Sequence, residues 1–170
     1  MASFYQATVA EFLAQTDEYV LAQLTVGYAN RGFTQQFTDQ TLTWERDLHS
    51  LRFALDQCGK VSAAVGVWGL ILEFSIPRKE LRIDTVLLIG EAVVILEAKT
   101  GVAASQANRQ IEEYALLLHY FHKASNERRI VPILFTREPT TPNLLELKSA
   151  GILSIDVSVL DRAGDKRFLG

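Results

Sequence analysis

The chain of 170 residues contains one cysteine, no long apolar run and no excess of positive charge. The cysteine, Cys58, cannot form an internal disulfide or a thiolate cage for a metal, so it fits a small buried side chain in a reducing compartment. The longest apolar stretches, such as 85–96, are too short to span a bilayer. The N-terminus lacks the basic region and apolar core of a signal peptide, and we therefore expect a cytoplasmic protein without membrane contact.

The sequence also has no basic tract, and its formal net charge is −3. Tight binding to a nucleic-acid duplex depends on cationic contacts with phosphates. If the chain handles nucleic acid, we therefore expect weak binding by the chain alone, strengthened by a metal, a partner domain or self-association. The charge argues against a free-standing DNA-binding module. It argues less against a catalytic domain that another component delivers to its substrate.

The composition, with 48% apolar and 22% charged residues, is that of a globular domain and not of a disordered tail. No internal repeat, low-complexity tract or linker divides the chain. We expect a single domain over 1–170, with a helical N-terminal part (1–60), a core (61–136) and a C-terminal helix and strand (137–170).

Apolar residues recur at three- and four-residue spacing in the first third, and Thr16 is suited to cap the second of the helices that this spacing predicts. The pattern then changes to segments rich in Val, Ile and Leu, separated by short turns. The predicted helices are 8–14, 17–29, 39–57, 104–123 and 143–149, and the predicted strands are 67–76, 81–89, 92–98, 129–136 and 152–160. A three-strand meander followed by a crossover helix implies an α/β fold, a mixed sheet with helices on both faces.

The turn between the second and third predicted strands sets the position of two carboxylates. If Gly90–Glu91 is a two-residue hairpin loop, Ile89 pairs with Ala92. The same register places Asp84 opposite Glu97, with their Cβ atoms about 5 Å apart on one face. Lys99, two residues after Glu97, belongs to that face as well.

A second hairpin extends this arrangement to the first strand. If 77–80 is a four-residue loop, Ile76 pairs with Leu81 and Glu73 lies opposite Asp84. Glu73, Asp84 and Glu97 then form one row of carboxylates across three strands. Like charges in apolar strands are costly, and a hard divalent cation, Mg²⁺ or Mn²⁺, relieves their repulsion. Lys99 would stabilise developing negative charge or help to position a water molecule.

These residues resemble the signature of PD-(D/E)xK nucleases: Asp84, then Glu97-x-Lys99 on the next strand, then Thr100-Gly101. The sequence has Ile83 where the signature has proline. The resemblance implies a restriction-endonuclease-like fold. It also implies that Asp84 and Glu97 bind Mg²⁺ or Mn²⁺, with the Ala98 carbonyl as a further ligand, and that Lys99 is the catalytic lysine.

Two further positions match features of the superfamily. Gln110 and Tyr114, on the following helix, form a Q-x-x-x-Y that is similar to the extra motif of the RecB-like branch, which implies that they line the site or touch the substrate strand. Some superfamily members place an acidic residue on the helix before the sheet, and Glu45 is the candidate for it. Glu73 competes with Glu45 for the role of third metal ligand.

A closer resemblance covers most of residues 4–136. The segments 71–101, 110–122 and 128–135 are similar to the N-terminal nuclease-like domain of bacterial proteins whose remainder is a P-loop ATPase or helicase. The resemblance implies a metal-dependent nuclease that hydrolyses phosphodiester bonds in DNA, in repair or defence, beside a helicase or ATPase domain or subunit. Because the chain has no Walker A lysine motif, it is then an excised domain or a stand-alone relative.

Two alternatives remain open at this point. The first is a catalytically inactive nuclease-fold module that docks nucleic acid or a partner; the acidic balance favours it and the intact carboxylate–lysine set disfavours it. The second is a small-molecule α/β enzyme, for which the sequence offers no motif. Arg82, near the first turn, either contacts phosphate or pairs with Glu73 or Glu80.

Overall fold

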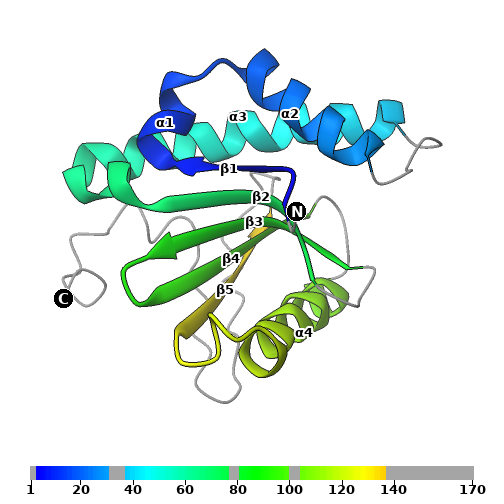
Figure 1. The fold of residues 1–170 in the computed structure, drawn as a ribbon, viewed down its shortest axis with the longest axis vertical. Helices are drawn as coiled ribbons and strands as arrows, with labels where there is room; N and C mark the ends of the chain where they lie inside the picture. The colour runs from blue at the N-terminus through cyan, green and yellow to red at the C-terminus, as the bar shows by residue number, and fades with distance from the viewer. Residues whose placement is uncertain (1–2, 31–36, 77–80, 100–103, 137–170) are drawn as a thin grey trace.

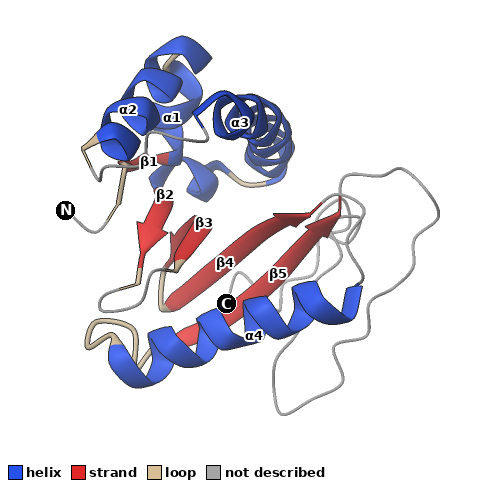
Figure 2. Ribbon diagram, turned by 90° about the vertical axis from the view of Figure 1, so that its right-hand side faces the viewer, coloured by secondary structure: helices blue, strands red, loops and turns tan. Residues whose placement is uncertain are grey.

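The computed structural model describes residues 3–30, 37–76, 81–99 and 104–136. In this part of the chain a sheet lies between two helical layers, with α1 (Val9–Ala14), α2 (Asp17–Ala29) and α3 (Phe37–Val61) on one face and α4 (Ala104–Phe121) on the other (Figures 1 and 2). A short 3₁₀ helix, η1 (Ala63–Val67), follows α3. The strands are β1 (Tyr5–Thr8), β2 (Gly69–Ser75), β3 (Arg82–Ile89), β4 (Ala92–Lys99) and β5 (Arg129–Thr136).

The five strands lie in the order β1-β2-β3-β4-β5. The first three pairings are antiparallel, and β4 pairs with β5 in parallel. A parallel pair needs a crossover connection, and α4 is that connection. The mixed sheet and the two-sided helical cover are therefore as predicted.

Each face of the sheet has its own apolar core. The core on the side of α1, α2 and α3 includes Phe12, Leu24, Trp44, Leu48, Leu70 and Leu72. The core on the side of α4 includes Phe74, Ile83, Ile95, Ile111, Tyr114 and Leu118. Strands buried from both sides explain why the sequence shows continuous apolar runs and not strict alternation.

The N-terminal helices begin where side chains can satisfy their first amide groups. Thr8 caps α1 in a capping box with Glu11, and the Thr16 hydroxyl accepts a hydrogen bond from the Tyr19 amide at the start of α2. The predicted cap at Thr16 is confirmed. A four-residue strand, β1, precedes α1 and was not predicted, since its partner β2 lies more than sixty residues further along the chain.

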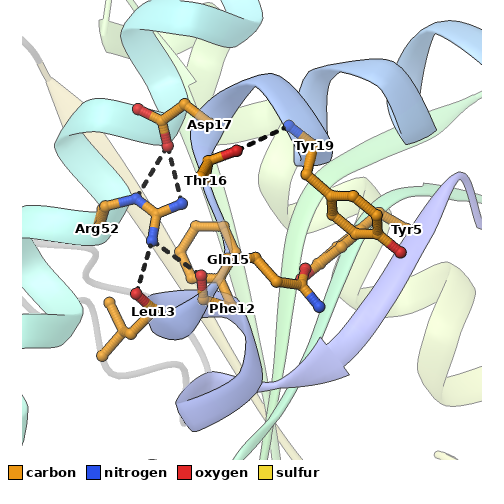
Figure 3. Close-up of polar contacts among 8 residues, drawn as sticks. All are labelled: Tyr5, Phe12, Leu13, Gln15, Thr16, Asp17, Tyr19 and Arg52. Carbon is orange, nitrogen blue, oxygen red and sulfur yellow. Dashed lines mark hydrogen bonds and ion pairs between the residues drawn. The ribbon is translucent and has the colours of Figure 1, made fainter.

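Arg52 of α3 joins the three N-terminal helices (Figure 3). Its guanidinium forms an ion pair with Asp17 at 2.8 Å, at the start of α2. The same group donates hydrogen bonds to the carbonyls of Phe12 and Leu13, in the last turn of α1, and lies over the Phe12 ring. Carbonyls at a helix end have no partner within the helix, and a cation is favourable there.

The remaining boundaries agree with the predicted elements to within a few residues. The largest difference is α3, which runs from Phe37 to Val61 and so extends beyond the predicted 39–57 at both ends. The predicted helix 143–149 and strand 152–160 lie outside the described residues. Within the described ranges, no helix is both long and apolar enough to cross a membrane.

Candidate active site

The turn at Gly90–Glu91 has the predicted register. Ile89 pairs with Ala92, and the ladder continues without a slip to Thr85 and Leu96. Gly90 has φ +53°, a left-handed conformation that favours glycine. The next positions along the two strands are Asp84 and Glu97.

Glu97 is a buried carboxylate, only 1% exposed, on β4. Its Oε1 accepts a hydrogen bond of 2.9 Å from Nε2 of Gln110 on α4, so its side chain lies on the α4 face of the sheet. The same Gln110 nitrogen donates to the Tyr114 hydroxyl at 2.6 Å. Because glutamine and tyrosine are four residues apart, they share one side of α4. The structure thus brings Gln110, Tyr114 and Glu97 together.

Asp84 lies beside Glu97 on the neighbouring strand and is half-buried. Its Oδ2 accepts a hydrogen bond from the Ala98 amide, at 3.4 Å, which ties the aspartate to the residue that follows Glu97. Thr85 pairs with Leu72 and Leu96 of the α3-side core, whereas Ile83 lies in the α4-side core, so the alternation of faces changes at Asp84 as well. The hydrogen bond from the Ala98 amide therefore shows that Asp84 lies next to the segment of β4 that carries Glu97.

The pKa of Tyr114 reflects its burial and the negative charges of Asp84 and Glu97. The pKa of its phenol is raised to about 12, mainly by burial and also by the negative charges of Glu97, Asp84 and Glu113, whereas the hydrogen bond from Gln110 opposes the shift. The phenol therefore stays protonated near neutral pH. It can accept the Gln110 hydrogen bond and still donate its own proton.

Glu73, the third carboxylate of the predicted row, does not join Asp84 and Glu97. It is 4% exposed, and its carboxylate accepts a 2.7 Å hydrogen bond from the Trp44 indole on α3 and pairs with Arg82 at 3.0 Å. Burial raises the Glu73 pKa to about 7; Arg82 and Trp44 act against this shift, and the charge of Asp84 adds to it. Arg82 therefore pairs with Glu73, one of the two acidic partners considered for it, and the other, Glu80, lies outside the described residues.

The backbone conformation at Glu73 explains why its side chain leaves the predicted row of carboxylates. The predicted β2–β3 register holds on both sides of it, at Leu72–Thr85 and Phe74–Ile83, but Glu73 itself has φ +54° and makes no ladder pair. A left-handed residue breaks the regular pleat, so the alternation of faces changes there. Leu72 accordingly lies in the core beside α3, and Phe74 lies in the core beside α4. The correct register therefore did not give the correct face for Glu73.

Lys99 and Glu45 are the two remaining predicted site residues. Lys99 is the last residue of β4 and is in register with Thr136 of β5; its side chain lies outside what the structure describes. Glu45 is exposed on α3, next to the buried Trp44. The role of Trp44 as a partner of Glu73 could not be found from the sequence, because no local pattern links residues of two separate elements.

The donor atoms of Asp84 and Glu97 suit a hard divalent cation. Carboxylate oxygens are preferred ligands of Mg²⁺, which commonly takes one or two of them and completes its shell with water and substrate phosphate. Among the described residues, no set of three or more His, Cys, Asp or Glu is arranged to hold a metal ion.

Comparisons of the chain with family models, with curated proteins and with solved structures find no match. The resemblance to PD-(D/E)xK nucleases therefore depends on the motif residues of β3, β4 and α4.

Proposed function

We propose that this chain is a divalent-metal-dependent nuclease of the PD-(D/E)xK type that hydrolyses phosphodiester bonds in DNA, beside a helicase or ATPase domain or subunit in repair or defence. One observation carries the proposal. The half-buried Asp84 accepts a hydrogen bond from the Ala98 amide, next to the fully buried Glu97, in strands that are largely apolar. A buried and a half-buried carboxylate close together are costly, and binding a cation is a physical reason to keep them.

Asp84 and Glu97 would hold the Mg²⁺ or Mn²⁺ ion. When bound, this ion polarises a phosphodiester and lowers the pKa of a coordinated water. The hydrogen bond from Gln110 fixes the orientation of the Glu97 carboxylate, and Tyr114 fixes that of the Gln110 amide. Lys99, two residues after Glu97 at the end of β4, would supply the positive charge that stabilises the pentacovalent phosphate.

A cleavage assay tests the proposal. Purified protein is expected to nick or degrade DNA with Mg²⁺ or Mn²⁺ and to leave it intact with EDTA. Asp84→Ala should reduce cleavage to background, and Lys99→Ala should reduce it by about 10²- to 10³-fold, because each removes charge aimed at the reacting phosphate. Glu91→Gln, an exposed change in the turn of the same hairpin, is the matched control and should retain full activity. Equal cleavage by wild type and Asp84→Ala contradicts the proposal.

The net charge of −3 favours a second candidate, a nuclease-fold module that docks nucleic acid or a partner without cleaving it. Calorimetry with Mn²⁺ separates the two. A nuclease should bind the ion stoichiometrically and lose this binding in Asp84→Ala, whereas an inactive module should show no binding that depends on Asp84.

A further inference from the structure

Glu73 combines two features that are unfavourable for a purely structural residue. Among the described residues it is the one non-glycine residue with positive φ, at 54°. It is also a carboxylate that is 4% exposed. A glycine or asparagine would adopt this backbone conformation more easily, and an apolar side chain would be buried more easily. Strained backbone held in place by its surroundings is commonly found at functional sites.

The surroundings of Glu73 hold it tightly. The Trp44 indole donates to one carboxylate oxygen at 2.7 Å, and Arg82 Nε contacts the other at 3.0 Å. Arg82 in turn lies over the rings of Phe4 and Tyr28, at 5.4 Å from each centroid. These residues come from α2, α3, β3 and the segment before β1. The network therefore anchors the β2–β3 strand pair to the N-terminal helical layer.

This anchor lies directly beside the candidate active site. The flanking pairs Leu72–Thr85 and Phe74–Ile83 place Glu73 at the position opposite Asp84. In a regular strand Glu73 would lie on the α4 face, about 5 Å from Asp84. Its left-handed backbone takes its carboxylate to Trp44 instead. The Glu73 carboxylate is thus held by Trp44 and Arg82, although it remains close enough to Asp84 for the two charges to interact.

We propose that Glu73 is a positioning residue of the Asp84–Glu97 site: held by Trp44 and Arg82, it keeps β2 in the conformation that supports β3 at Asp84. This inference rests on the proposed function, because it assigns to Glu73 an effect on metal binding at that site. It differs from the role as a direct metal ligand that the sequence predicted for Glu73.

The test compares Mn²⁺ affinity in folded variants of the whole chain by calorimetry. Glu73→Gln removes the charge that holds Arg82 but keeps an oxygen for the Trp44 indole, and Trp44→Phe removes the indole donor but keeps an aromatic ring. Residues that orient metal ligands typically change metal affinity by about 10- to 100-fold when they are replaced. We expect a loss in this range for Glu73→Gln and a smaller loss for Trp44→Phe.

Asp17→Asn is the matched control, since it breaks the Arg52–Asp17 ion pair, which also joins an arginine to the N-terminal helices. It should lower stability without changing Mn²⁺ affinity. A metal-free readout is hydrogen exchange at the Ala98 amide, which donates to Asp84. Its exchange should become faster in Glu73→Gln and stay unchanged in Asp17→Asn.

The outcomes separate the inference from the proposed function. If the wild type binds Mn²⁺ and both network variants bind it equally well, Glu73 is structural only and the proposed function stands. If the wild type binds no Mn²⁺, both are overturned. If Asp17→Asn lowers the affinity as much as Glu73→Gln does, the effect comes from general destabilisation, and the inference is wrong.

Discussion

At the scale of single residues, Glu73 should give the protein a characteristic pH dependence. Its pKa in the folded state is raised to about 7, mainly by burial, from an ordinary value of 4.5. The folded state therefore binds more protons than the unfolded state between these two values, so stability falls as pH rises through this window. The shift corresponds to roughly 3 kcal/mol.

Urea denaturation at several pH values between 4.5 and 8 measures this effect. The free energy of unfolding of the wild type should decrease across the window, and that of Glu73→Gln should decrease less, because the amide does not titrate. Parallel curves for the two proteins would show that another group is responsible.

The backbone at the same residue allows a second prediction. Glu73→Ala and Glu73→Gly both remove the carboxylate, but only glycine adopts φ 54° without strain. We expect Glu73→Gly to be more stable than Glu73→Ala by about 1–2 kcal/mol, measured as the free energy of unfolding. In an ordinary strand the order would be reversed, so a more stable alanine variant would argue against the left-handed conformation.

At the scale of elements, the β3–β4 hairpin shows which features the sequence can predict. The Gly90–Glu91 turn determined the register, and this register gave the neighbouring positions of Asp84 and Glu97. The same reasoning gave the correct β2–β3 register but the wrong face for Glu73. Turn chemistry is local and visible in the sequence. A left-handed residue stabilised by Trp44 depends on tertiary contacts, and no local pattern indicates it.

Alanine substitutions at Gly90 and Gly59 should have opposite effects on stability, because the two glycines differ in backbone conformation. A Cβ at Gly90 or at Gly59, in α3, would meet no atom within 4 Å, so neither substitution creates a clash. Gly90 has φ +53° and Gly59 is helical. Gly90→Ala should therefore lower the free energy of unfolding by about 1–2 kcal/mol, and Gly59→Ala should raise it by up to about 1 kcal/mol. Thermal denaturation of both variants measures the difference, and changes of the same sign would contradict it.

The contacts of Arg52 should make it the main polar link within the N-terminal layer. Arg52→Ala removes an ion pair with Asp17 and two hydrogen bonds to carbonyls of α1, so we expect a loss of roughly 2 kcal/mol. Arg46 lies on the same helix but is exposed, and it donates a hydrogen bond to the Leu42 carbonyl within its own helix. Arg46→Ala should change stability by less than about 0.5 kcal/mol. Equal losses in chemical denaturation would contradict the structural role of Arg52.

At the scale of the whole molecule, the sheet separates two apolar cores, and the candidate site lies between the sheet and α4. The fold class and most element boundaries followed from apolar patterning, because long periodic segments determine both. The first strand, β1, could not be predicted from this patterning, because its four residues give too short a pattern and pair with a distant part of the chain.

A metal bound at Asp84 and Glu97 should stabilise the entire fold. An ion that binds only the folded state adds about 2.7 kcal/mol at a free concentration of 100 times its Kd. Thermal unfolding should therefore shift upward with Mn²⁺ in the wild type, and the shift should be lost in Asp84→Ala. A shift of the same size in both proteins would place the ion elsewhere.

The shortness of the Gly90–Glu91 loop has a consequence for how this chain can change in length. Side chains of a strand alternate with a period of two, so one residue added to this loop moves every later side chain of β4 to the opposite face. Glu97 would then leave Gln110, and Leu96 would take its place. Val93 and Ile95 would move out of the α4 core in the same step. The loop can therefore tolerate the addition of residue pairs more readily than single insertions, and its length is tied to the chemistry of the site.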